Sequence, residues 1–223
     1  CDTLLARGDQ VICVDNFNNY YDPKIKENNV KHNLNHPNYK LFRVDILNYE
    51  DMKTVFLSEY PEKIIHLAAR AGVRPSIENP KLYFEVNVKG TLNMLKLANE
   101  FKIQNFIFGS SSSVYGNRES GPFSETDHVN RPVSPYAVTK KAAEELCYTY
   151  HYLYGLNISC LRFFTVYGPR GRPDMAPLKF TRLISNNETI EVYGDGTSKR
   201  DYTYVTNLVS GILAALDGNF GYE

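Results

Sequence analysis

A tyrosine and a lysine at the start of a long amphipathic stretch could act together as a general base. Tyr136 and Lys140 have the spacing that places two side chains on one face of a helix, one turn apart. An ammonium group beside a phenol stabilises the phenolate and lowers the phenol pKa from about 10 towards neutral pH. The same spacing occurs at two other places, Tyr20 with Lys24 and Tyr49 with Lys53. We interpret those two pairs as solvated helix starts, so spacing alone does not single out Tyr136.

A run of small hydroxyl residues lies upstream of this pair, directly after an apolar segment. Residues 105–108 have the composition of a buried strand, and residues 109–116 read Gly-Ser-Ser-Ser-Ser-Val-Tyr-Gly. Ligands bind at the carboxyl edge of an open parallel sheet, so this loop could present hydroxyl groups to a substrate. The alternative is a flexible, solvated turn. The Tyr136 helix that follows the next loop favours a binding site.

A candidate cofactor residue, Asp15, ends the first strand-like segment. An acidic residue at the tip of the second strand of a dinucleotide-binding unit can accept both adenine-ribose hydroxyls, which favours NAD over NADP. The glycine fingerprint of such a unit lies roughly 20 residues before this Asp and is therefore expected upstream of residue 1. None of the 14 glycines forms a GxGxxG or GxxGxxG pattern, which fits that expectation. Asp15 could also be only a turn former beside Asn16.

The elements that must carry these residues alternate along the chain. Strand-length apolar runs occupy residues 11–14, 40–44, 63–67, 105–108 and 157–162. Helix-length amphipathic segments occupy residues 23–34, 49–59, 80–101 and 135–154. Asn-Pro and Ser-Pro pairs mark helix starts. This alternation predicts an α/β fold of the Rossmann type, a doubly wound parallel sheet with crossover helices.

The amino-acid composition changes after Gly168, because residues 168–173 are rich in proline and glycine. A helix at 176–185, a short strand at 190–193 and a last helix at 205–216 are predicted. We expect a dinucleotide-binding domain of residues 1–167 and the start of a smaller substrate-binding domain of residues 168–223, with helix 205–216 packing on the first domain. Both ends of the sequence are expected to be truncated. A Leu-Leu pair shortly before Gly8 is typical of the last turn of a helix that ends in a glycine cap. The beginning of that helix and the N-terminal strand before it are therefore expected upstream of residue 1. Residues 220–223 fall where a further strand could start.

Composition places the chain among globular proteins of balanced charge. Its 223 residues are 43% hydrophobic with a formal net charge of +0, enough for one core and part of a second unit. Balanced charge argues against a nucleic acid or a membrane surface as partner. The short apolar stretches predict no membrane span, and a cytoplasmic location is expected. No CxxC spacing joins Cys1, Cys13, Cys147 and Cys160, which predicts reduced core thiols and no structural metal.

Three ordered segments resemble the extended short-chain dehydrogenases. They are residues 106–116 (FIFGSSSSVYG), 134–140 (SPYAVTK) and 161–169 (LRFFTVYGP). UDP-galactose 4-epimerases, UDP-glucuronate 4-epimerases and sugar-nucleotide 4,6-dehydratases belong to this group, and the resemblance covers Leu4 to about Leu216. It implies NAD as cofactor, a UDP-sugar as substrate, a homodimer and a place in polysaccharide biosynthesis.

The resemblance also implies roles for individual residues. Tyr136 matches the catalytic base, Lys140 the lysine that holds the nicotinamide ribose and tunes that base, and Ser111 the hydroxyl that relays the proton. Dehydratases carry Asp-Glu immediately after that hydroxyl residue, whereas this chain has Ser112 and Ser113. Serine can act neither as acid nor as base at neutral pH, so elimination of water is disfavoured.

Further cofactor positions follow from the same resemblance. Asp45 and Ile46 match the pair that flanks adenine. Leu67, Ala68 and Ala69 match the small stretch beneath the pyrophosphate and ribose. The alternative for these three residues is a buried strand end in which small side chains permit close packing.

The substrate positions point to a hexuronate. Residues 161–176 and 71–76 look most like UDP-glucuronate 4-epimerase, and UDP-galactose epimerases typically carry Asn where this chain has Thr165. Ser112, Ser113 and Thr165 could form a neutral hydroxyl cradle for a C6 carboxylate. Three more residues match positions near the uracil and diphosphate, Tyr193, Arg200 and, as a weaker match, Arg172. Arginine suits phosphate because its planar fork donates in pairs, although a lone surface arginine is usually solvated.

The implied reaction is inversion of C4 through a 4-keto intermediate. Tyr136 takes the C4 hydroxyl proton through Ser111 while a hydride moves to NAD, the keto sugar turns over, and the hydride returns to the opposite face. UDP-glucose 4-epimerase is the nearest alternative. A 4,6-dehydratase, a UDP-glucuronate decarboxylase and a non-catalytic binding protein on this fold are the others.

Overall fold

The strands of the chain pair in parallel. The computed structural model describes residues 1–117, 122–192, 194–197 and 199–223, and every strand pair within them is parallel. The first sheet joins β1 (Val11–Val14) to β2 (Tyr39–Phe42). The second has β4 (Asn105–Ser111) between β3 (Lys63–His66) and β5 (Ile158–Phe163). A small third sheet joins β6 (Thr165–Tyr167) to β7 (Tyr202–Tyr204).

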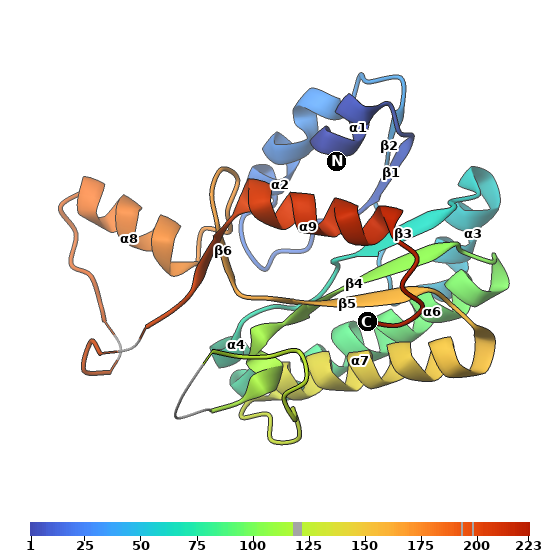
Figure 1. The fold of residues 1–223 in the computed structure, drawn as a ribbon. Helices are drawn as coiled ribbons and strands as arrows, with labels where there is room; N and C mark the ends of the chain where they lie inside the picture. The colour runs from blue at the N-terminus through green and yellow to red at the C-terminus, as the bar shows by residue number, and fades with distance from the viewer. Residues whose placement is uncertain (118–121, 193, 198) are drawn as a thin grey trace.

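Helices cover both faces of the central sheet, as a doubly wound fold requires. The described helices are α1 (Asp2–Arg7), α2 (Pro23–Val30), α3 (Tyr49–Glu59), α4 (Val73–Glu78), α5 (Pro80–Tyr83), α6 (Gly90–Glu100), α7 (Pro135–Tyr154), α8 (Ala176–Ser185) and α9 (Val205–Asp217). A π-helical stretch, η2 (Phe84–Lys89), joins α5 to α6, and single 3₁₀ turns follow α2 and β4 as η1 (Lys31–Asn33) and η3 (Ser112–Tyr115). Figure 1 shows α6 and α7 on one side of the sheet of β3, β4 and β5, and α9 on the other side.

The alternation of side chains along β4 explains this layering. Phe106 and Phe108 point into the main core, where α6 and α7 contribute Leu97 and Cys147. Ile107, between them, packs instead with residues of α9. Successive residues of a strand face opposite sides of a sheet, and every residue of β4 is buried. A strand buried on both faces is typical of the centre of a parallel sheet.

The long helix α7 has clear start and stop signals. The Ser134 side chain accepts a hydrogen bond from the Ala137 amide, which satisfies one of the free N–H groups of the first turn. Pro135 occupies the first turn, where its missing N–H costs no hydrogen bond. The helix ends at Gly155 with φ of 70°, a left-handed conformation that glycine adopts without steric cost. These signals explain why the predicted bounds 135–154 are confirmed.

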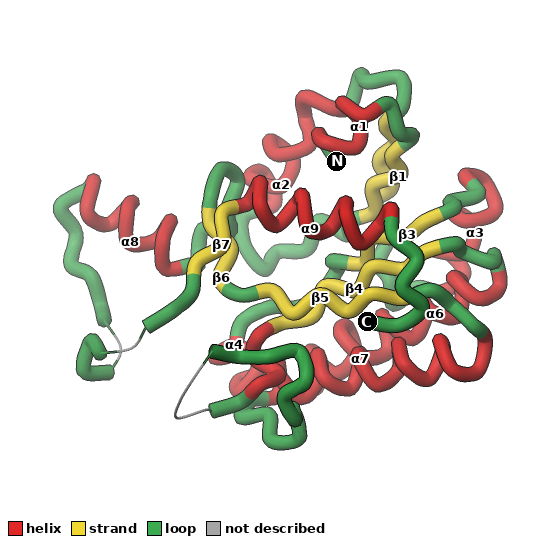
Figure 2. Tube along the Cα trace, in the orientation of Figure 1, coloured by secondary structure: helices red, strands yellow, loops and turns green. Residues whose placement is uncertain are grey.

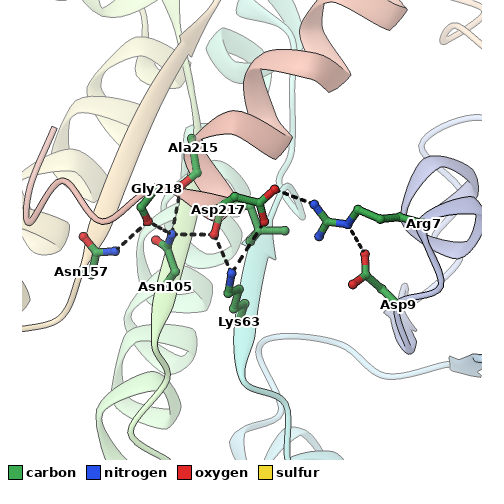
Figure 3. Close-up of polar contacts among 9 residues, drawn as sticks. Arg7, Asp9, Lys63, Asn105, Asn157, Ala215, Asp217 and Gly218 are labelled. Atoms are coloured by element: carbon green, nitrogen blue, oxygen red, sulfur yellow. Dashed lines mark hydrogen bonds and ion pairs between the residues drawn. The ribbon is translucent and has the colours of Figure 1, made fainter.

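The end of α9 is fixed to the sheet by polar side chains (Figure 3). The Asn105 amide nitrogen lies 2.9 Å from three carbonyl oxygens, those of Ala215, Leu216 and Gly218. Lys63 donates to the Leu216 carbonyl at 3.0 Å, and Arg7 donates to Asp217 at 2.6 Å. The last carbonyls of a helix lack partners within the helix and favour nearby cations. The side chains of β3, β4 and α1 therefore anchor α9 against the sheet.

Several sequence predictions are confirmed and some are wrong. Strands at residues 11–14, 40–44, 63–67, 105–108 and 157–162 are found with shifts of at most three residues at their ends. The glycine cap before β1 is confirmed, because Gly8 has φ of 94° and closes α1. The C-terminal residues also add to the edge of the sheet, because Tyr222 forms a parallel bridge with Ile158 of β5. Figure 2 shows this tail running along the outer edge of β5.

The remaining differences concern short elements. Residues 190–192 form no strand, and the last residue of that prediction, Tyr193, lies outside the described residues. The structure adds β6, β7 and α4, which were not predicted. The helix predicted at residues 80–101 is divided into α5, η2 and α6, and that at 23–34 into α2 and η1. None of these helices is long and apolar enough to cross a membrane, within the part of the chain described.

The cysteines are free, as predicted, but not all lie in the core. Cys147 is buried between α7 and the sheet, and Cys13 and Cys160 are half-buried. Cys1 is exposed, so the prediction of a core thiol is wrong there.

Candidate active site

The start of α7 presents Tyr136 towards the carboxyl end of β4. The Tyr136 amide donates to the Ser76 hydroxyl at 3.1 Å, and the phenol ring packs edge-on against Tyr83 with centroids 6.3 Å apart. Ser76 is buried on α4 and donates in turn to the Val73 carbonyl. The short helix α4 therefore fixes the backbone of the first turn of α7.

The structure brings Ser111 and Tyr136 together. Ser111 is the last residue of β4; its hydroxyl donates to the Ser113 hydroxyl at 3.2 Å and lies close enough to the Tyr136 phenol to lower the pKa of that phenol. Its hydroxyl also accepts the Ser113 amide at 3.2 Å, which caps the turn η3 that carries Ser112 and Ser113. The hydroxyl run is therefore part strand and part ordered turn, and the alternative of a flexible solvated loop is wrong for these residues.

Lys140 is buried one turn beyond Tyr136. Its ammonium group donates to the Gly109 carbonyl at 2.6 Å and lies 4.9 Å from the centroid of the Phe108 ring. Burial lowers the pKa of Lys140 to about 8, and the charges of Cys147 and Glu144 act in the opposite direction. A lysine with this pKa can be charged or neutral near physiological pH.

Opposing effects act on the Tyr136 phenol. Burial raises the pKa of Tyr136, as does the nearby Tyr20 to a smaller extent. The Ser111 hydroxyl and the charge of Arg172 lower this pKa. Burial outweighs these two lowering effects, so the net shift is upward. The groups that favour the phenolate here are therefore Ser111 and Arg172, while the Lys140 ammonium is bound to Gly109.

Arg172 lies beside this cluster and is held by Asp174. Two guanidinium nitrogens donate to the Asp174 carboxylate at 2.8 and 2.7 Å. The guanidinium also lies 5.3 Å from the centroid of the Tyr20 ring. Burial lowers the pKa of Arg172, but the hydrogen bond and charge of Asp174 outweigh it and raise the pKa.

The interpretation of Tyr20 as a solvated helix start is wrong. Tyr20 precedes α2, is half-buried, and donates its hydroxyl to the Ala71 carbonyl at 2.9 Å. Tyr83 donates to the same carbonyl at 2.7 Å. Tyr49, by contrast, does begin a helix, and its hydroxyl donates to Glu100 at 2.8 Å.

A cavity of about 180 Å³ lies next to Arg172. Its walls come from β6, from the following turn and from the first turns of α8, and include Gly168, Met175 and Thr181. Thr165, at the start of β6, pairs with Tyr202 of β7. The region predicted to bind substrate therefore contains a small hollow bordered by a cation.

The cofactor candidates lie at the carboxyl ends of β1 and β2. Asp15 is exposed, and its carboxylate accepts the Phe17 amide at 2.6 Å. Asn16 donates to the Asp45 carboxylate at 2.7 Å, which joins the two strand ends. Asp15 is therefore a turn former, and it also keeps a carboxylate facing solvent at the strand tip.

The other cofactor candidates differ in exposure. Leu67 is 51% exposed, Ala68 is exposed and Ala69 is half-buried, so the alternative of a buried strand end is wrong for the first two. The Ile46 side chain is 7% exposed and packs in the main core against Gly90. The Ile46 side chain is therefore buried, unlike those of the exposed candidates Leu67 and Ala68.

Of the remaining candidates for the nucleotide half, Arg200 is not brought to the cluster. Arg200 is exposed and donates to the neighbouring Lys199 carbonyl at 2.8 Å, a contact within its own loop. Tyr193 lies outside the described residues. Within the described ranges, no group of three or more His, Cys, Asp or Glu side chains is arranged to hold a metal ion.

Sequence reasoning missed a buried amide that supports the site. The Asn87 side chain accepts the Arg70 amide at 2.7 Å and donates to the Arg70 carbonyl and to the Thr139 hydroxyl. Thr139 donates to the Tyr136 carbonyl at 2.8 Å. The signal for Asn87 was a polar residue on the apolar face of the helix predicted at 80–101.

A buried histidine was also missed. His66 ends β3, and its Nε2 lies 3.0 Å from the Thr91 hydroxyl. Thr91 donates its own hydroxyl proton to the Asn87 carbonyl, so in the contact between His66 and Thr91 the Nε2–H of His66 is the donor. Burial lowers the pKa of His66 to about 3, helped by the Lys140 charge, which keeps the ring neutral at pH 7.

Residues 1–221 match the model of the family described as the NAD dependent epimerase/dehydratase family. The UDP-glucuronate 4-epimerase of Thermodesulfobacterium geofontis (strain OPF15) is 46% identical over 99% of this chain and 68% of its own length. Protein CapI of Staphylococcus aureus is 48% identical over 94% of this chain, which spans 62% of that relative. A crystal structure of UDP-glucuronic acid 4-epimerase from Bacillus cereus in complex with UDP-glucuronic acid and NAD superposes with a TM-score of 0.92 at 35% identity, over 99% of this chain and 69% of that one. The chain therefore belongs to the NAD dependent epimerase/dehydratase family.

Proposed function

We propose that the protein containing this chain is an isomerase that uses NAD to invert C4 of UDP-glucuronate. The observation that carries the proposal is the position of the Ser111 hydroxyl, near enough to the Tyr136 phenol to lower its pKa, with Lys140 one turn along α7. This group stands at the carboxyl end of the central strand, the edge at which open α/β sheets bind ligands. Relatives named UDP-glucuronate 4-epimerase support the choice of reaction.

The residues at the carboxyl ends of the strands, together with Lys140, are suited to holding NAD. The exposed Asp15 carboxylate at the tip of β1 suits the hydroxyls of the adenine ribose. Asp45 would lie near the adenine, with Ile46 beside it, and the exposed surface of Leu67 and Ala68, continued by Ala69, would face the pyrophosphate and ribose. Lys140 would hold the nicotinamide ribose. When bound, NAD supplies the acceptor that takes a hydride from C4 of the sugar and returns it.

The chain's own residues handle the proton. The Ser111 hydroxyl lies beside the Tyr136 phenol and would pass the proton of the C4 hydroxyl to the phenolate oxygen. The charge of Arg172 favours that phenolate, and burial opposes it. After the keto sugar has turned over, Tyr136 returns the proton through Ser111 to the C4 oxygen. The phenol therefore ends each cycle in its starting state.

The hydroxyl groups around the site favour an acid sugar and disfavour dehydration. Ser112 and Ser113 follow Ser111 on η3, and Thr165 opens β6. Together they would hold a C6 carboxylate without a formal cation, and none of them can supply the acid and base that loss of water requires. Arg172, Arg200 and Tyr193 would serve the nucleotide half of the substrate. In this proposal residues 1–167 bind NAD and residues 168–223 begin the domain that binds the UDP-sugar.

UDP-glucose 4-epimerase is the second candidate. A crystal structure of the Thermotoga maritima UDP-glucose 4-epimerase with UDP-glucose superposes on this chain with a TM-score of 0.87 at 32% identity. That enzyme would need the same proton relay, so the choice between the two depends on the residues near C6.

The test is incubation of the complete protein with NAD and either UDP-glucuronate or UDP-glucose, with the products resolved by NMR. We expect UDP-galacturonate from UDP-glucuronate. UDP-galactose as the sole product would favour the second candidate. A keto-deoxy sugar, release of CO₂ or no turnover with either sugar would overturn the proposal in favour of a dehydratase, a decarboxylase or a binding protein. The homodimer, the cytoplasmic location and the place in polysaccharide biosynthesis stay predictions, the first to be checked by sedimentation.

A further inference from the structure

A buried carboxylate lies one turn beyond Lys140 on the face of α7 that carries Tyr136. The Glu144 side chain is 7% exposed. Its Oε1 accepts the Ser110 hydroxyl at 2.5 Å, and Arg162 donates to both of its oxygens, at 3.1 and 3.0 Å. Ser110 and Arg162 are partners in the register of β4 and β5. The Glu144 carboxylate therefore contacts β4 and β5 at two residues that are paired with each other in the sheet.

The three groups form a unit that is costly to break. A buried carboxylate is tolerated only when it is paired and hydrogen-bonded. The guanidinium supplies a two-point contact of the kind that fixes orientation as well as charge. The hydrogen bond to Glu144 raises the pKa of Arg162, so the guanidinium stays charged. Loss of either partner would leave the other charge buried and unpaired.

The unit touches the segments that carry the candidate site. Ser110 directly precedes Ser111, the proposed proton relay. Arg162 lies 5.0 Å from the centroid of the Tyr115 ring, and Tyr115 ends the turn that carries Ser112 and Ser113. The Tyr115 ring also stacks on Phe164, at a centroid distance of 6.4 Å, and Phe164 precedes Thr165. Glu144 is thus connected, through Ser110 and through the chain of Arg162, Tyr115 and Phe164, to the segments that carry the candidate hydroxyls.

We infer that Glu144 is a positioning residue for the proton relay: with Arg162 and Ser110 it fixes the end of β4, and so Ser111, relative to Tyr136 and Lys140 on α7. This inference rests on the proposed function. Proton transfer requires the donor and acceptor within hydrogen-bond reach, and a displacement of about 1 Å caused by a distant change can lower a rate by about a hundredfold.

The chain offers a matched control next to Glu144. Glu145 occupies the following position of α7, but its side chain is 65% exposed and pairs with Lys141 at 3.0 Å. Exposed ion pairs of this kind contribute little. Glu144→Gln and Glu145→Gln therefore remove the same charge from the same helix, one from the buried unit and one from the surface.

The experiment measures kcat and KM of the complete protein with NAD and UDP-glucuronate, expressed per folded protein from thermal melts. We expect Glu144→Gln to lower kcat about tenfold to a hundredfold while KM changes by less than about twofold, and Glu145→Gln to match the wild type. Equal behaviour of the two variants would overturn the inference, as would a rise in KM at unchanged kcat. A wild type that turns over neither UDP-sugar would overturn the proposed function itself, which is a different result.

A second variant covers the case in which Glu144→Gln does not fold. Ser110→Ala removes one hydroxyl and leaves the contact between Glu144 and Arg162 in place. We expect it to lower kcat in the same way, by about fivefold or more, and an unchanged kcat would overturn the inference. Where both variants fold, the double variant should lose no more than Glu144→Gln alone, because both changes weaken the same contact between residues 110 and 144. Multiplying losses would show that Glu144 does not act through Ser110.

Discussion

The Ser111 hydroxyl, at the end of β4, lies close enough to the phenol of Tyr136, in the first turn of α7, to lower the pKa of that phenol. A hydrogen bond to a phenolate stabilises it, whereas burial of the Tyr136 ring raises its pKa. The relationship between a strand end and a helix start therefore decides whether the phenol can serve as a base, and it depends on the caps and the buried side chains that hold both elements.

Removal of the Tyr136 hydroxyl should abolish most turnover without affecting the fold. Tyr136→Phe keeps the ring and its edge-on contact with Tyr83, so the melting temperature should stay within a few degrees of the wild type. Loss of the base should lower kcat by about 10² to 10⁴. Tyr49→Phe, at the start of α3 and bonded to Glu100, is the control and should stay active. A Tyr136→Phe enzyme with normal turnover would remove this residue from the mechanism.

The buried Lys140 should make stability depend on pH in the alkaline range. Its pKa is lowered to about 8, mainly by burial, from an ordinary value of 10.5. Between these two values the unfolded chain binds more protons than the folded chain, so this group adds stability as pH rises from about 8 to about 10.5, by up to about 3 kcal/mol. Chemical denaturation of the NAD-free wild type and of Lys140→Met should show this rise in the difference between them. A difference that stays flat or falls across that window would contradict a lowered pKa.

The proximity of Tyr136 and Lys140 and the bounds of the long helices were predictable because their signals are local. The proline and serine at the start of α7 and the glycine at its end fix the bounds of that helix, and the spacing of Tyr136 and Lys140 then places both on one face. The strands of the central sheet were predictable from short apolar runs such as residues 105–108, although β4 continues for three further residues, to Ser111.

The supporting contacts were not predictable, because they depend on the pairing of distant segments. Glu144 meets Arg162 only through the register of β4 and β5. The strands β6 and β7 are three residues each and exist only because they pair with one another. Tyr20 looked like a solvated helix start because nothing in its neighbourhood shows that the Ala71 carbonyl lies within reach of its hydroxyl.

The cap at the start of α7 should contribute measurably to stability. The Ser134 hydroxyl accepts the Ala137 amide at 3.1 Å, and Ser134 itself is buried. Ser134→Ala leaves that amide without a partner and should lower the free energy of unfolding by about 1 kcal/mol. Ser134→Asp keeps an acceptor at the cap and should lose less, because an acidic group is also favoured at a helix N-terminus. Urea denaturation of both variants is the measurement, and equal losses would show that the cap is not the cause.

Substrate choice should depend on the Thr165 hydroxyl. Thr165 opens β6 and pairs with Tyr202, and valine has the same branched shape and suits a strand, so Thr165→Val should preserve the sheet. If the hydroxyl holds the C6 carboxylate of UDP-glucuronate, its hydrogen bond to that charge contributes about 1.5 to 3 kcal/mol. The kcat/KM for UDP-glucuronate should then fall about tenfold or more, while any activity on UDP-glucose changes little. Thr203→Val is the matched control, because Thr203 lies on the neighbouring strand opposite Val166. Equal losses on both sugars would show that Thr165 does not recognise the carboxylate, and would move the assignment to UDP-glucose 4-epimerase.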